Sequence, residues 1–347
     1  MFGETIFLVS LICLCESRIH SHQHDHSDLD HFHNHLLHGA PPTPNPLIPA
    51  LIKFPLSAVK LDPTSSFFTS QDRNARYMLS LDNSRLTCLF TSAANLTGTW
   101  EKPTCDPYSH PGYYGHYFGH YLSALAIYIE NAGSSPMGMA LAAKLDELLN
   151  TMVQVEAAWA LVGQPGYFFP RSPIAFDALE DNTQHCDPCV PYYIFHKSLA
   201  GLIDISERLG NAKAKTLAIG MGDWVVQRVA GVLTKGGQTQ WQMVLGTEWG
   251  GMNDGLYNLY RLTGDEKYLT TASAFNHWDW TSPLVEHDDQ LGRFHANTHI
   301  PEVMGDLNGY SLTQNATQAS IVDNFLSILL TNHSWATGGS NDHECES

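Results

Sequence analysis

A repeated helical hairpin is the feature that most constrains how this chain of 347 residues can fold. Residues 199–224 and 255–278 both contain an apolar helix, a turn with Gly, Asn or Asp, and a second helix. Apolar residues recur at intervals of three and four, which is the spacing of one buried helical face. Aligning Gly201 with Gly255 sets the two copies 54 residues apart. A repeat of this length indicates a helical array.

Weaker copies of the hairpin extend the array in both directions. One starts at Leu122, and another surrounds Asn315. Strand-like alternation is scarce between 115 and 335, so the sequence predicts an all-α fold. A solenoid and a toroid both fit such an array. The loops between hairpins are rich in glycine, aromatic and ionisable residues, and a toroid would gather them at one mouth. This favours an (α/α) barrel that follows a short extended segment near Phe54.

Two helix starts that carry histidine are candidates for a site. His116 and His120 lie four residues apart, and therefore on one face of a helix. Such a pair can bind a metal, but no glutamate lies between them in the pattern of a zinc protease, so a supporting or core role is favoured. His196 opens an apolar helix, where the helix dipole lowers the pKa of an imidazole. A neutral role in a site and a structural role both fit His196.

The loops before two further helices carry other polar candidates. Glu248 and Trp249 precede a Gly-Gly hinge, and the pair Asn253–Asp254 that follows is suited to capping the next helix. His295 and Asn297 lie in what the sequence predicts to be the loop before another helix, where their side chains can bind hydroxyl groups. Acids, histidines and an aromatic ring beside glycines are typical of a binding cleft.

Six phrases, in order, resemble the beta-L-arabinofuranosidase family of glycoside hydrolases, family 127. They include PYYIFHKSLAGLID, EWGGMN, LYRLTGD, HANTHIPEVMG and ATGG, preceded by GTWEKPTC with GHYLSA. The resemblance implies an (α/α)6 barrel followed by β-sandwich domains, and retaining hydrolysis of beta-L-arabinofuranosides. It also implies that His196, Glu248 and His295 line a sugar pocket. With Trp249 and Asn297, which stand beside Glu248 and His295 in the sequence, they make up the predicted sugar-binding residues.

The same resemblance implies a glutamate as acid/base and a zinc-bound cysteine as nucleophile. Glu344 stands at the spacing of the acid/base after the ATGG phrase, although His343 replaces the glycine of the family pattern. The family's Glu-Ser-Cys phrase and later cysteines do not occur among these residues. We therefore expect residues 54–347 to form a C-terminally truncated, incomplete barrel domain that has no metal site and no cofactor of its own, although the family uses zinc.

Two functions fit these features. The first is a secreted beta-L-arabinofuranosidase-type hydrolase that is inactive in this form because it lacks the nucleophile. The alternative is a non-catalytic carbohydrate-binding protein or scaffold. A net charge of −17 excludes nucleic acid and acidic membranes as partners, because phosphate groups need Lys and Arg to neutralise them. A carbohydrate is the expected partner, no membrane helix is predicted, and the sequence does not set the oligomeric state.

The N-terminal part has a different character. Residues 1–18 are typical of a secretory signal peptide, with an apolar run too short to span a bilayer. Residues 19–53 are rich in histidine and proline, cannot bury a core, and are predicted to be disordered. A solvated spacer is the favoured interpretation of this tract, and loose binding of zinc or copper is a third hypothesis for the function of the chain.

Two further patterns agree with secretion. Glycosylation sequons, which would make this a glycoprotein, start at Asn95, Asn315 and Asn332. Five cysteines follow the leader, and in an oxidising compartment Cys88 and Cys105 can pair. Cys186 and Cys189 form a single CxxC, which is a weak signal for zinc, so a structural role is favoured for them.

Overall fold

A computed structural model describes most of the chain after the leader. The described residues are 54–96, 105–110, 112–182, 190–342 and 345–346. Within them the chain is helical or irregular, apart from a short hairpin of β1 (Asn341–Asp342) and β2 (Cys345–Glu346). The predicted all-α fold is confirmed. The predicted signal peptide, the histidine tract and Glu344 lie outside the described residues.

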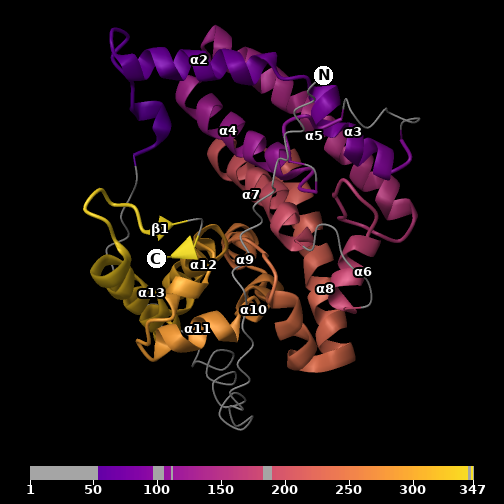
Figure 1. The fold of residues 1–347 in the computed structure, drawn as a ribbon. Helices are drawn as coiled ribbons and strands as arrows, with labels where there is room; N and C mark the ends of the chain where they lie inside the picture. Colours follow the sequence, from indigo (N-terminus) through magenta and orange to yellow (C-terminus); the bar gives the residue numbers. More distant parts are fainter. Residues whose placement is uncertain (1–53, 97–104, 111, 183–189, 343–344, 347) are drawn as a thin grey trace, which may run out of the picture.

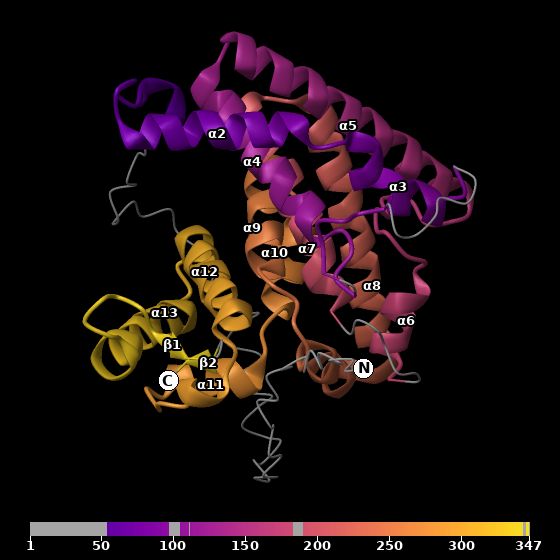
Figure 2. The same cartoon turned by 45° about the horizontal axis from the view of Figure 1, so that its top comes forward.

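Four helical hairpins form the body of the molecule and follow one another in an arc (Figures 1 and 2). The first helices of the hairpins, here called inner helices, are α4 (His116–Ala132), α7 (Pro191–Leu209), α9 (Met252–Thr263) and α12 (Ala296–Thr313). Their partners are α5 (Pro136–Leu161), α8 (Ala212–Leu245), α10 (Glu266–Ala274) and α13 (Ala316–Ile328). Each inner helix packs on the next, α4 on α7, α7 on α9 and α9 on α12. This is the packing of an incomplete α/α toroid.

The turns of the hairpins explain why the helices stop and restart where they do. Three of the four inner helices end on a residue in the left-handed conformation, and these residues are Gly210, Gly264 and Gln314. Each is followed by a side chain that caps the outer helix, supplied by Asn211, Asp265 and Asn315. A left-handed residue satisfies the last carbonyl groups of a helix, and an Asn or Asp cap satisfies the first amides of the next one.

The remaining elements lie beside the hairpins. They are η1 (Leu56–Ala58), α2 (Ser66–Ser80), α3 (Asn83–Ala93), α6 (Ile174–Glu180), α11 (Trp278–Val285), η3 (Leu291–Arg293) and a π-helical turn η4 (Leu329–His333). Helices α2 and α3 both pack on α5. The predicted disulfide between Cys88 and Cys105 is confirmed, and it joins α3 to the segment before α4. No helix in the described part is both long and apolar enough to cross a membrane.

Two apolar clusters hold the helices together. The larger one runs through α4, α5, α7, α8 and α9, whereas a smaller one joins α11, α12 and α13 around Trp280, Ile321 and Phe325. The contact between α4 and α7 is especially close, because a Cβ added at Gly119 would clash with the backbone of Lys197. Backbone meets backbone here, and this brings the side chains at the starts of the two helices together.

Candidate active site

The candidate active site lies where the inner helices begin. His116 is the first residue of α4, and Tyr193 and Lys197 belong to the first two turns of α7. Glu248 precedes α9 by four residues, and His295 is the N-cap residue of α12. Because the inner helices pack side by side in the same order, these starts meet at one end of the arc, as the sequence predicts for a toroid.

A chain of hydrogen bonds joins α4, α7 and α12. The Tyr193 hydroxyl lies 3.0 Å from Nε2 of His116, and Nδ2 of Asn297 donates to the same hydroxyl at 3.2 Å. Nε2 of His120 lies 3.2 Å from Nε2 of His116, and the His116 ring stacks on that of Tyr193. Three inner helices therefore present donors and acceptors to a common point.

A second pair, between the α9 loop and α12, carries the negative charge of the site. Nδ1 of His295 lies 2.8 Å from Oε1 of Glu248, and the Thr298 hydroxyl lies 3.0 Å from the same nitrogen. Burial raises the pKa of Glu248. Hydrogen bonds from His295 and Thr298, together with the charges of His295 and His299, outweigh burial and hold that pKa below its usual value. Glu248 is therefore ionised at neutral pH and accepts hydrogen bonds.

Lys197 interacts electrostatically with both parts of the site, with the ring of Tyr193 and with the charge of Glu248. Its ammonium lies 4.1 Å from the centre of the Tyr193 ring. Burial lowers the pKa of Lys197 to about 8, although the charge of Glu248 acts in the opposite direction. Burial, aided by His120 and Lys197, lowers the pKa of His116 to about 4, so its imidazole is neutral at pH 7. We call His116, Tyr193, Lys197, Glu248, His295 and Asn297 the sugar-site cluster, after the sugar-binding role that the family resemblance implies for several of them.

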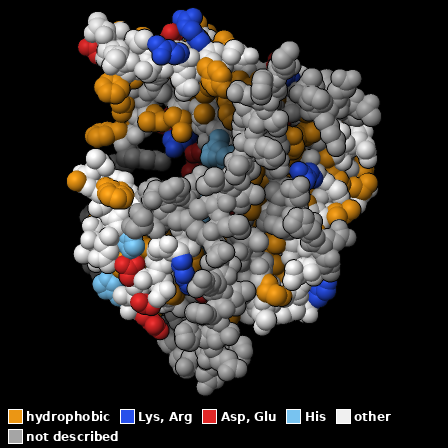
Figure 3. All heavy atoms as spheres, viewed as in Figure 1, with side chains coloured by type: hydrophobic (Ala, Val, Ile, Leu, Met, Phe, Trp, Pro, Cys, Tyr) orange, Lys and Arg blue, Asp and Glu red, His pale blue; other side chains and the backbone are white. Residues whose placement is uncertain are grey.

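The molecular surface is hollowed at this end of the arc. Figure 3 shows a hollow beside α4 and α7 and above α12, with basic, acidic and histidine side chains visible inside it. The side chains of His295 and Glu248 are each about one-quarter exposed, at 26% and 25%. Solvent therefore reaches this pair, and so can the hydroxyl groups of a ligand.

His196 and Trp249 are placed differently from the other predicted sugar-binding residues. His196 lies beneath the Gly250–Gly251 turn, where a Cβ added at Gly251 would come within 3.2 Å of its ring. Its Nδ1 is buried and has no hydrogen-bond partner in the part of the chain that the structure describes. The Trp249 side chain is 2% exposed and packs on Phe275, so a sugar cannot stack on its ring in this arrangement. Both residues support the loop that carries Glu248.

Three predictions about helix starts are wrong. His196 does not open α7, because it lies in the second turn of that helix. Asn253 and Asp254 do not cap α9, because both lie inside that helix and Gly251 is its N-cap residue. Asn253 instead donates from Nδ2 to the carbonyl oxygen of Glu302 on α12, at 2.9 Å. Asn297 lies inside the first turn of α12 rather than in the loop before it. From inside these helices, Asn253 bonds to α12 and Asn297 bonds to Tyr193 on α7, so both side chains hold inner helices together at the site.

Sequence reasoning missed two residues and placed two others outside the site. Tyr193 and Lys197 lie four apart within the PYYIFHK phrase, so their shared helix face was a usable signal. His116 and His120, predicted to have a supporting or core role, belong to the hydrogen-bond chain described above. The catalytic role of Glu344 stays a prediction, because this residue lies outside the described part of the chain.

The described residues do not fit the zinc-bound thiolate that the family resemblance implies. Cys88 and Cys105 are bonded to each other, and a disulfide sulfur is not a thiolate ligand. Cys186 and Cys189 lie outside the described residues, and the side chain of Cys345 is not described either. We therefore derive no chemical step through zinc at this site.

One solved structure and one protein family are similar to this chain. A similar solved structure is Ara127N, a family 127 beta-L-arabinofuranosidase from Geobacillus stearothermophilus T6, at 12% sequence identity and a TM-score of 0.49. The match covers 80% of this chain and 44% of that one, so the chain spans less than half the length of its solved relative. No curated protein matches the sequence. Residues 58–347 match the family described as the GH127 catalytic domain of beta-L-arabinofuranosidase, and the chain therefore belongs to this glycoside hydrolase family.

Proposed function

We propose that the sugar-site cluster binds the terminal sugar of beta-L-arabinofuranosides. The observation that carries this proposal is the pairing of an ionised Glu248 with His295 beside the chain from Asn297 through Tyr193 to His116. A furanose presents several hydroxyl groups, each of which donates and accepts hydrogen bonds. A carboxylate, an amide, a phenol and a neutral imidazole provide matching partners on one surface.

Glu248 acts in this proposal as a hydrogen-bond acceptor and not as a general acid. A catalytic acid must be protonated at the working pH, which requires a raised pKa. His295 instead lowers the pKa of Glu248, which keeps this carboxyl group ionised. Glu344, expected from the family resemblance to be the acid/base, is retained as a separate proposal for the glycosidic oxygen.

We propose binding of beta-L-arabinofuranosides by this polypeptide and assign no nucleophile among its described residues. Hydrolysis with retention needs a nucleophile at the anomeric carbon, and the two described cysteine side chains are joined in a disulfide. The disulfide between Cys88 and Cys105 also supports a proposal that the protein is secreted, because disulfides persist in oxidising compartments. Asn95, the start of one predicted sequon, is exposed.

Calorimetric titration with methyl beta-L-arabinofuranoside tests the binding proposal. We expect saturable binding to the 347-residue chain, and weaker binding of the alpha anomer and of methyl beta-D-glucopyranoside. Equal affinity for all three glycosides, or no saturable heat with any of them, would refute the assignment. In parallel, release of nitrophenol from its beta-L-arabinofuranoside above the level of Glu344→Gln would show that the polypeptide carries a working nucleophile.

A further inference from the structure

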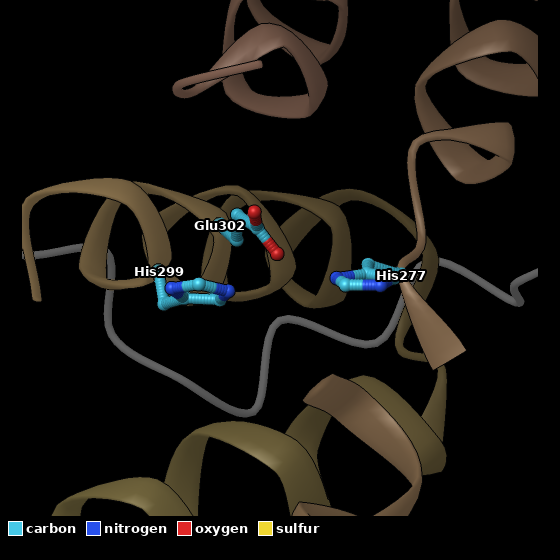
Figure 4. A group of neighbouring side chains, drawn as sticks. All are labelled: His277, His299 and Glu302. Carbon is cyan, nitrogen blue, oxygen red and sulfur yellow. The ribbon is translucent and has the colours of Figure 1, made fainter. Parts of the chain in front are cut away.

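Three side chains outside the sugar-site cluster meet in the interior: His277, His299 and Glu302 (Figure 4). One ring nitrogen of each histidine and one carboxylate oxygen of Glu302 all lie within 4.8 Å of one another. His277 is the N-cap residue of α11, whereas His299 and Glu302 are three residues apart on α12 and share one face of that helix. The group therefore joins the connection between α10 and α11 to α12.

Three polar atoms of this group lack hydrogen-bond partners among the described residues. Glu302 is 1% exposed, and neither of its carboxylate oxygens has a hydrogen-bond partner among the described residues. Nδ1 of His277 is also buried without a partner. An unpaired buried carboxylate costs several kcal/mol, and buried charges in proteins are normally paired or bound to metals. A cation held between the three side chains would remove this cost.

His299 is already oriented as a metal ligand. Its Nδ1 lies 2.9 Å from the carbonyl oxygen of His295, and since a carbonyl only accepts, Nδ1 must carry the proton. Nε2 then keeps its lone pair. Metal-binding histidines usually donate their second ring nitrogen to a carbonyl or carboxylate in this way. Burial also lowers the pKa of both His277 and His299 to about 4, which leaves their rings neutral at pH 7.

We propose that His277, His299 and Glu302 bind one divalent transition-metal ion, with zinc as the expected metal. Two imidazoles and one carboxylate match the donor preference of Zn²⁺, with a water molecule as the fourth ligand. Calcium and magnesium are disfavoured because they prefer oxygen ligands alone. Each protein ligand needs to move only slightly, since zinc ligands lie about 2 Å from the ion.

The position of the site indicates a structural role. The rings of Trp280 and Phe294 each lie 4.6 Å, centre to centre, from the ring of His299, so apolar groups shield that ligand. His299 also holds the backbone of His295, whose side chain contacts Glu248. A metal here would fix the start of α12, and with it one wall of the sugar-site cluster.

This site differs from the expectation of a chain without metal ligands. That expectation rested on cysteine spacing, whereas the group proposed here contains no cysteine. It also differs from the glutamate and cysteine ligands that the family resemblance implies.

The proposal is tested by comparing the zinc content per chain of the wild-type 347-residue protein with that of single variants. The histidine tract of residues 20–38 can also bind metal, but it is the same in every variant and cancels in the comparison. Wild type, Glu302→Gln, His277→Asn and Asp306→Asn would be equilibrated with zinc, passed through gel filtration, and analysed for metal and for helical circular dichroism. Asp306 is the matched control, since it is a buried acid one turn further along α12.

We expect Glu302→Gln and His277→Asn each to carry about one zinc ion fewer per chain than wild type, and Asp306→Asn to match wild type. Zinc should also raise the melting temperature of wild type more than that of Glu302→Gln, because a ligand that binds only the folded state stabilises it. Equal zinc content in wild type and a folded Glu302→Gln would overturn the proposal. A higher melting temperature of that variant without zinc would then identify Glu302 as a buried carboxyl group that no cation compensates.

Discussion

Nδ1 of His295 lies 2.8 Å from Oε1 of Glu248, although 47 residues separate the two in sequence. This contact ties the start of α12 to the loop before α9. The backbone of His295 is held in turn by His299, whose ring donates to its carbonyl oxygen at 2.9 Å. His295 therefore links the sugar-site cluster, to which its side chain belongs, with the proposed metal site, which its carbonyl group contacts through His299.

The Tyr193 hydroxyl is expected to contribute to sugar binding. Tyr193→Phe keeps the ring beside His116 but removes the acceptor for Asn297. We expect affinity for methyl beta-L-arabinofuranoside to fall about 3- to 10-fold, the value of one or two neutral hydrogen bonds. Tyr260→Phe, which removes a hydroxyl bonded to Glu266 on the far half of α9, is the control for calorimetry. Equal losses in both variants would argue against a specific role.

The close contact of α4 with α7 should tolerate no side chain at Gly119. Gly119→Ala places a Cβ against the backbone of Lys197, and we expect the free energy of unfolding to fall by about 1–3 kcal/mol. Gly231→Ala is the matched control, since nothing lies within 4 Å of its added Cβ inside α8. That change should stabilise the protein by about 0.5–1 kcal/mol in urea titrations. A neutral Gly119→Ala would mean that the helices are further apart.

The disulfide should stabilise the N-terminal part of the fold. Cys88 and Cys105 are separated by 17 positions, so their bond closes a short loop of the unfolded chain. Replacing both by serine should lower the free energy of unfolding by about 2–4 kcal/mol. Reducing the wild type with dithiothreitol should lower the melting temperature to that of the double variant. A melting temperature insensitive to both treatments would contradict the prediction.

Acid should destabilise the protein through His116. The folded pKa of His116 is about 4, below its ordinary value of 6.5, so between these values the unfolded chain binds more protons than the folded one. Stability from this group is therefore complete above about pH 6.5 and is lost as the pH falls towards 4. Urea unfolding at pH 7 and pH 5 should show a smaller loss for His116→Gln than for wild type. An equal loss would place His116 in solvent.

Local signals made the hairpin array predictable. Gly210 with Asn211 and Gly264 with Asp265 are each a helix stop followed by a helix start, and this chemistry is complete within a few residues. Gln314 adopts the same left-handed conformation without being glycine. This hairpin is therefore harder to recognise in the sequence, although its turn has the same geometry as the others.

Contacts between distant segments were the part that sequence could not supply. Trp249 stands beside Glu248 in the same loop, and the sequence does not determine whether the Trp249 ring faces the hollow or the core. The core position depends on Phe275, which lies in a different segment. His277 belongs to no phrase that resembles the family, so only the fold brings it to His299. By contrast, Glu248, His295 and Asn297 were predictable because each lies close to a helix start.

Calorimetry of Glu248→Gln with methyl beta-L-arabinofuranoside tests most directly whether the sugar-site cluster binds the sugar. The change keeps the shape of the side chain but removes the charge that accepts from His295 and from a sugar hydroxyl. We predict binding about 10- to 100-fold weaker than wild type, the effect of losing a charged hydrogen bond. Glu207→Gln, on an exposed position of α7, should bind like wild type. Affinity of Glu248→Gln within twofold of wild type would contradict the account.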